Sequence, residues 1–125
     1  MRIQIHAQKI DIDETIEAYM ERRLQFALGR FADVVGRVEV TLSDINGPKG
    51  GHDKQCRIRV DLKRQSSPVF AEILHEDLRT SIDLAADRLG RAVARAVDRH
   101  SGERISRRRA AAVSSRASQL SVYFE

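Results

Sequence analysis

VEVTLSDINGPKGGHDKQCRIRVDL, residues 38–62, is the stretch that decides the fold. Over 38–43 and again over 56–62, apolar residues occupy every second position. Strict alternation is typical of a strand with one buried face. The segment 46–54 between the two runs collects Gly, Pro, Asn and Asp, which favour turns. The stretch therefore predicts an antiparallel hairpin with a long connection.

The residues before the hairpin predict a strand and then a helix. Residues 2–7 alternate between apolar and polar side chains, as in a half-buried strand. From Glu14 onward apolar residues recur at spacings of three and four, which predicts an amphipathic helix. Gly36 marks the end of this region. Asp11 or Asp13 can cap this helix by accepting backbone N–H bonds. The apolar positions of the helix are Ile16, Tyr19, Met20, Leu24, Ala27, Leu28 and Phe31.

The residues after the hairpin predict a short strand over 69–74 and a long helix from about Glu76 to His100. Along this helix the apolar residues fall within an arc of roughly 120°. They are Leu78, Ile82, Ala85, Ala86, Leu89, Val93, Ala96 and Val97. The whole order is β-α-β-β-β-α, which predicts an α+β two-layer sandwich with both helices on one face of a four-stranded sheet.

The length of 125 residues favours a single domain, which we place over residues 1–100. From Ser101 onward the sequence is rich in Ser, Arg and Ala and has no lasting apolar period. Residues 101–125 are therefore predicted to be a basic, flexible tail. Apolar and aromatic residues return at Leu120, Val122, Tyr123 and Phe124, and we expect a frayed terminus rather than a docking segment.

Positive charge is concentrated toward the C-terminal end of the chain. Residues 1–62 are neutral overall, whereas residues 63–125 carry twelve basic and eight acidic side chains and supply the whole net charge of +4. On the long helix, four arginines fall within an arc of roughly 80° opposite the apolar side. They are Arg88, Arg91, Arg95 and Arg99. This arginine ridge predicts binding to a polyanion, with nucleic acid favoured over a membrane surface.

The aromatic residues argue against one mode of RNA recognition. A sheet that reads single-stranded RNA stacks bases on exposed Phe or Tyr side chains. Neither the second nor the third predicted strand places an aromatic residue on its outward face. Recognition of the shape and phosphates of a folded RNA therefore fits better than sequence-specific readout.

The loop between the hairpin strands offers two further hypotheses. Its glycines and Lys49 suggest a phosphate cradle, but a P-loop requires a helix to follow and here a strand follows. A flexible loop is the preferred interpretation, with Lys49 and Lys54 as weaker candidates for RNA contact. His52, Asp53 and Cys56 are too few and too close together to predict a metal site, and Cys56 lies on the inward phase of its strand.

No arrangement in the sequence predicts an enzyme. His6, His75 and His100 lie near the ends of different elements, and none has a Ser or Cys partner placed as a nucleophile. The acids after His75 are better explained as helix caps than as general bases. We therefore expect no catalysis, no cofactor and no small-molecule substrate.

The compartment is expected to be the cytoplasm. No apolar run approaches the roughly 20 residues that span a bilayer, and the N-terminus lacks the apolar core of a signal peptide. The only cysteine excludes an internal disulfide framework. No membrane association is predicted.

The ordered set of these segments resembles the ribosome hibernation promoting factor family, also called protein Y or the ribosome-associated inhibitor and earlier the sigma-54 modulation protein. The resemblance covers about residues 1–100. It rests on Ile10-Asp11-Ile12, on 38–43, on His75-Glu76-Asp77-Leu78 with Ile82-Asp83, and on Arg88-Leu89-Gly90-Arg91 with Arg95 and Arg99.

This resemblance implies a fold like that of double-stranded-RNA-binding domains with an extra strand. It further implies binding to the small ribosomal subunit between head and body, where the protein blocks the mRNA path and the A- and P-site tRNA positions in stationary phase or stress. By the same analogy the ridge arginines contact rRNA. A generic structured-RNA binder and a protein-interaction domain are the alternatives.

The sequence departs from the family pattern in two places. Arg79 stands where the family usually has Tyr, so a contact made through that aromatic is in doubt, although Arg79 adds positive charge to the predicted rRNA site. The C-terminal dimerisation domain of long members has no counterpart, and the tail is basic where one short type has an acidic extension. We expect a short-type monomer off the ribosome. The preference for single or paired ribosomes is left open.

Overall fold

The computed structural model describes the backbone of residues 1–45 and 53–120 and the side chains of residues 1–45 and 53–99. Two compact units divide the chain, Met1–Ala94 and Arg95–Glu125, and each is described by itself. The elements are β1 (Arg2–Gln8), α1 (Glu14–Leu28), a 3₁₀ turn η1 (Gly29–Phe31), β2 (Val35–Asp44), β3 (Lys54–Leu62), β4 (Val69–His75) and α2 (Leu78–Leu120). The predicted order β-α-β-β-β-α is confirmed.

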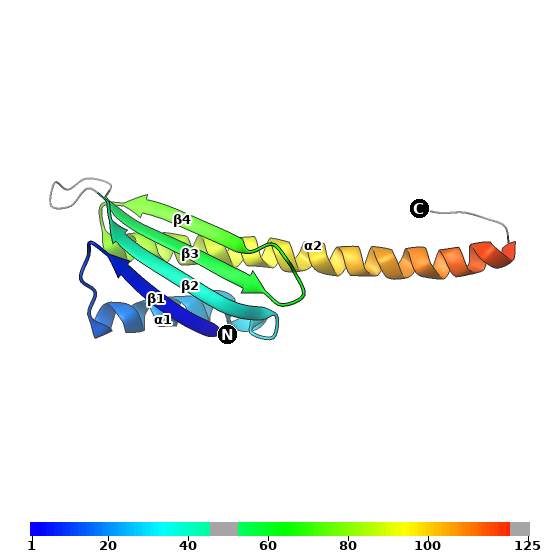
Figure 1. The fold of residues 1–125 in the computed structure, drawn as a ribbon, viewed down its shortest axis with the longest axis horizontal. Helices are drawn as coiled ribbons and strands as arrows, with labels where there is room; N and C mark the ends of the chain where they lie inside the picture. The colour runs from blue at the N-terminus through cyan, green and yellow to red at the C-terminus, as the bar shows by residue number, and fades with distance from the viewer. Residues whose placement is uncertain (46–52, 121–125) are drawn as a thin grey trace. The chain divides into compact units, whose positions relative to one another are not determined.

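The four strands form one mixed sheet in the order β1-β2-β3-β4, and α1 and α2 lie on the same face of it (Figure 1). Strand β1 pairs with β2 in parallel, so α1 serves as the crossover that parallel strands require. The pairs β2–β3 and β3–β4 are antiparallel. The predicted hairpin is thus confirmed, and the bond from Ile45 N to Asp53 O, 2.9 Å long, joins its two arms.

The core lies between the sheet and the helices, and it follows the predicted alternation. Every second residue of β3, and of β2 from Val38 to Leu42, points inward, so that Val40 pairs with Ile58 at the centre of the sheet. The apolar residues of the first unit that are at most 4% exposed are Met20, Leu24, Leu28, Val35, Val38, Val40, Leu42, Cys56, Ile58, Val60, Leu62, Ala71, Ile82, Ala85, Ala86, Leu89 and Val93. Each large side chain among them contributes about 1.5–3 kcal/mol of burial free energy.

Cys56 is buried in this core, as its position on the strand predicts. Burial disfavours the charged thiolate and raises the pKa of the Cys56 thiol to about 12. The side chain is therefore a small apolar core residue. His52, which the sequence placed beside it as a potential metal ligand, lies outside the described residues.

Both helices begin at a capping aspartate. At α1 the cap is Asp13, whose Oδ1 accepts a 2.9 Å bond from Ile16 N, so Asp13 rather than Asp11 has this role. Asp77 precedes α2 and accepts bonds from both Thr80 N and Thr80 Oγ1. These bonds, the hydroxyl one above all, hold the pKa of the Asp77 carboxyl below its usual value. Asp77, the second of the two acids after His75, is thus a cap, as predicted.

The predicted end of the second helix near His100 is wrong, because α2 continues to Leu120. Residues 101–120 contain several Ala and Arg and no Pro, and such a composition favours helix even without an apolar period. The predicted flexibility of residues 101–125 concerns side chains outside the described set and stays a prediction, as does the domain boundary at residue 100. No helix among the described residues is long and apolar enough to cross a membrane.

Candidate nucleic-acid interface

Helix α2 separates its apolar and basic residues, as the sequence predicts. In the first unit, Ile82, Leu89 and Val93 are buried, whereas Arg88 and Arg91 are exposed. Farther along the same helix, in the second unit, Arg95 and Arg99 are also exposed. All four candidate arginines therefore stand at solvent-accessible positions.

Arg88 has a structural contact that the sequence does not reveal. Its Nη1 donates a 3.3 Å bond to the backbone carbonyl of Glu72 in β4. Strand β4 is an edge of the sheet, and edge strands expose backbone groups that need partners. Arg88 thus helps to cover this edge, while its positive charge stays exposed and no carboxylate neutralises it among the described residues.

A polar network joins α1 to α2. Arg23 of α1 lies 3.1 Å from Asp83 Oδ1 and 2.8 Å from Asp87 Oδ1, both on α2. The Tyr19 hydroxyl donates to Asp83, and this bond above all raises the pKa of Tyr19. Both acids that flank the ridge in the first unit are therefore engaged by α1.

Arg79 extends this network at the start of α2. Its guanidinium lies 5.2 Å from the centre of the Tyr19 ring, within the range of a cation–π contact. Arg79 is itself exposed and packs on an aromatic ring supplied by α1.

Gly90 lets the two helices approach closely. A Cβ at this position would lie 3.3 Å from the Ala27 carbonyl oxygen and 3.5 Å from the Ala27 Cβ. The spacing of the helices therefore depends on the absence of a side chain at Gly90. The same absence sets how far the exposed residues of α1 lie from those on the first turns of α2.

Of the two lysine candidates for RNA contact, the structure describes only Lys54. Lys54 is half-buried, and its ammonium lies 2.8 Å from Asp44 Oδ2 and 3.1 Å from Asp53 Oδ2. The bond to Asp44, followed by that to Asp53, raises the pKa of Lys54. Two carboxylates therefore offset its charge, which makes it a weak phosphate ligand. Lys49 lies outside the described residues.

The outer face of the sheet also carries arginines, but acids neutralise most of them. The ion pairs are Arg37–Glu39, Arg57–Glu72 and Arg59–Asp61, each 3.2 Å long. The outward positions of β2 and β3 hold no aromatic residue, as predicted, but β4 places Phe70 on this face with 57% of its surface exposed. Arg59 lies 5.9 Å from the centre of that ring.

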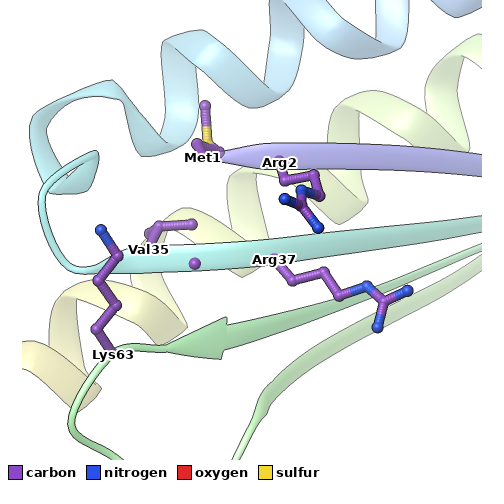
Figure 2. Close-up of a pocket in the computed structure, with 6 residues that line it drawn as sticks. Met1, Arg2, Val35, Arg37 and Lys63 are labelled. Atoms are coloured by element: carbon purple, nitrogen blue, oxygen red, sulfur yellow. The ribbon is translucent and has the colours of Figure 1, made fainter.

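A shallow hollow of about 450 Å³ lies where β1 and β2 begin and β3 has just ended. Figure 2 shows the Arg2 and Arg37 side chains next to each other on neighbouring strands, with Lys63 beyond Val35. Arg37 already bonds Gln4 at 3.0 Å and pairs with Glu39. The hollow is therefore less cationic than its residue types suggest.

One exposed residue was missed at the sequence level. Phe26 of α1 is 82% exposed, more than any other large apolar residue of the described side chains. The signal was present, because Phe26 falls outside the apolar period of its helix and stands near Arg22, Arg23 and Arg30.

Comparison with known families now identifies the type of domain. Residues 3–101 match the family model described as Sigma 54 modulation protein / S30EA ribosomal protein. The chain belongs to this family. It is the family that the segment resemblance indicated, and the match ends close to the predicted boundary at residue 100.

Solved structures agree with this assignment. The N-terminal domain of Protein Y from Thermus thermophilus is 30% identical, with a TM-score of 0.61, and the match covers 76% of this chain and 98% of that one. A ribosomal subunit interface protein from Coxiella burnetii shares the fold at 19% identity, with a TM-score of 0.64 and coverage of 78% and 99%. Comparison with curated proteins gives no significant match.

Proposed function

We propose that the protein binds the small ribosomal subunit through the arginines of α2 and inhibits translation by occupying the channel for mRNA and for A- and P-site tRNA. The observation that carries the proposal is the segregation of α2 into a buried apolar side and exposed arginines, in a chain of the S30EA family. The mechanism is steric occlusion and involves no chemical step.

The arginines suit this role for electrostatic reasons. Guanidinium groups bind phosphate oxygens in a bidentate manner, and each neutralised phosphate releases counterions. Arg91 has no acidic partner among the described residues, and Asp83 and Asp87 are occupied by Arg23. We rank Arg88, Arg91, Arg95 and Arg99 first as rRNA ligands, Arg79 next, and Lys49 and Lys54 last.

Salt-dependent sedimentation with ribosomes tests the proposal. Wild-type protein should migrate with small subunits in sucrose gradients at low salt, dissociate at high salt, and inhibit translation in a parallel assay. The informative variant is Arg91→Gln with Arg95→Gln and Arg99→Gln, since Arg88 also supports β4. This triple variant should make the plot of log affinity against log salt shallower by about 2–3.

A matched control removes three positive charges elsewhere. Arg2→Gln, Arg37→Gln and Lys63→Gln change the hollow on the sheet and lower the net charge equally. This variant should keep nearly all subunit affinity. Equal losses in both variants would show that total charge rather than α2 governs binding, and wild-type protein that never migrates with ribosomes would refute the proposal. Equal affinity for arbitrary hairpin RNA would favour a generic RNA binder.

A further inference from the structure

Phe26 is an aromatic ring on the solvent side of α1. The core side of this helix is formed by Met20, Leu24 and Leu28, which are fully buried, whereas Phe26 is 82% exposed. A single exposed apolar residue is ordinary by itself. The environment of Phe26 is not ordinary, because arginines stand before and after it in a short stretch of sequence.

Three arginines lie near this ring in the sequence of α1 and η1. The Arg23 guanidinium is 5.8 Å from the ring centre. Arg22 stands four residues before Phe26 in α1, which places it on about the same side of the helix. Arg30 follows Phe26 by four residues and belongs to the 3₁₀ turn η1, and both arginines are exposed. Arg30 also lies 4.6 Å from the ring of Phe31.

The acidic residues of α1 do not offset this group. Glu14, Glu17 and Glu21 lie roughly 120–180° around the helix from Phe26. Arg22 has no hydrogen-bond or ion-pair partner within residues 1–45 and 53–99. The surface around Phe26 is therefore both aromatic and positively charged.

This combination matches the chemistry of an unpaired nucleotide. A planar ring stacks on a base without regard to its identity, and guanidinium groups bind the phosphates on either side. An apolar protein partner would gain from the ring but not from the surrounding arginines. A duplex offers phosphates but no free base face.

We propose that Phe26 is a stacking platform for an unpaired base of RNA, with Arg22 and Arg30 as ligands of the flanking phosphates. This deepens the proposed function, because it names the form of RNA that the helix side of the domain takes.

Substitutions at Phe26 separate stacking from other roles. Phe26→Leu keeps an apolar side chain without an aromatic face, and it should lower the affinity for small subunits by about 5- to 150-fold, the range measured for loss of one stacked base. Phe26→Tyr should stay within roughly twofold of wild type, because its ring still stacks. The loss in Phe26→Leu should be the same at low and high salt, whereas Arg22→Gln should also reduce the salt dependence.

Two controls address folding and general apolar effects. The exposure of Phe26 means that Phe26→Leu should melt at the wild-type temperature. Phe70→Leu makes the same change at another exposed ring, 57% exposed on the outer face of the sheet and near Arg59, and should leave subunit affinity unchanged. Equal affinity of wild type and Phe26→Leu, or equal losses in Phe26→Leu and Phe70→Leu, would overturn the stacking assignment.

A synthetic RNA separates this inference from the proposed function. The chain has no Trp, so Phe26→Trp introduces a single indole. Its fluorescence should be quenched by an RNA hairpin with an unpaired loop and not by a blunt duplex of the same stem. Quenching without subunit binding would refute the ribosomal role but support stacking, and subunit binding without quenching would do the reverse. A wild-type dimer that Phe26→Leu dissociates, with RNA binding unaltered, would assign the ring to a second copy and overturn the proposal.

Discussion

The outer face of the sheet and the outer face of the helices both carry arginines, but among the described residues most sheet arginines pair with acids and several helix arginines do not. On the sheet, Arg37, Arg57 and Arg59 each pair with an acid of the same face. On the helices, the acids nearest the ridge are drawn into the contact between α1 and α2. Arg22 and Arg91 have no acidic partner within the described side chains.

From this difference we expect charge pairing, rather than arginine content, to distinguish a surface that binds a polyanion from a solvated one. Exposed ion pairs contribute little stability, usually 0–1 kcal/mol, but they cancel the field that a polyanion would experience. In the first unit, Asp83 and Asp87 pair with Arg23, so they do not neutralise Arg88 or Arg91. The predictions below test each side of this contrast.

The largest effect on stability should come from adding a side chain where α1 and α2 approach each other. Gly90→Val would place a branched side chain against the Ala27 carbonyl, at a site where even a Cβ lies at 3.3 Å. We expect a loss of about 1–3 kcal/mol in the free energy of unfolding, measured by urea denaturation. Gly29→Val is the control, because nothing lies within 4 Å of its Cβ position, and a loss as large there would contradict the packing argument.

The cap of α2 should show a characteristic pH dependence. Asp77→Ala removes the acceptor for Thr80 N and Thr80 Oγ1 and should lower the urea midpoint at pH 7. The folded-state pKa of Asp77 is lowered, so its contribution is complete above the ordinary value of 3.8 and is lost as pH falls through the folded-state pKa. The difference between wild type and variant should therefore shrink in acid. Asp11→Ala is the control, because Asp11 caps neither helix, and it should leave the urea midpoint at pH 7 close to the wild-type value.

The ion pairs between the helices should matter more than a pair on the sheet. Arg23→Gln breaks contacts to both Asp83 and Asp87 and should cost about 1 kcal/mol of unfolding free energy. It also frees two acids near the ridge, so subunit affinity should fall. Arg57→Gln, which breaks one exposed pair, should cost about 0.5 kcal/mol or less. Equal losses of unfolding free energy in the two variants would show that the ion pairs between the helices contribute no more than a pair on the sheet.

Removing the acids that pair with the sheet arginines should make the charge of the outer sheet face more like that of the helix face. Glu39→Gln, Asp61→Asn and Glu72→Gln together raise the net charge from +4 to +7 and leave three unpaired arginines on that face. We expect a severalfold gain in affinity for arbitrary hairpin RNA at low salt, lost at high salt, and no gain in affinity for small subunits. A matching gain for subunits would show that either face can bind the ribosome.

The smallest effect should be seen at Cys56, which is buried in the core between the sheet and the helices. With its pKa near 12, the buried thiol should not react with a disulfide reagent at pH 8 until the protein unfolds. The rate of labelling, followed by absorbance with and without denaturant, measures this. Fast labelling of the native protein would show that the core opens locally.

Much of the fold could be predicted because its signals are local. The alternation in 38–62 determined the hairpin, and the helical period determined which side of α2 is buried. The end of α2 was wrong because the prediction relied on an apolar period. Residues 101–120 are helical through the propensities of their residues instead.

The candidate site was only partly predictable. The exposure of Arg88, Arg91, Arg95 and Arg99 follows from spacing along one helix. The same spacing could not show that Arg88 bonds β4, that Lys54 lies between two carboxylates, or that Arg79 packs on Tyr19. Each of these contacts involves an element that sequence spacing alone does not place.

The sequence by itself determined the order of elements, the buried side of each one and the excess of arginine on α2, since periodicity and composition act over a few neighbouring residues. Only the tertiary structure decided which charges remain unpaired. Arg23 meets Asp83 and Asp87 some sixty residues away along the chain, because Gly90 lets α1 and α2 approach. Charge pairing depends on distances in space, and packing sets those distances.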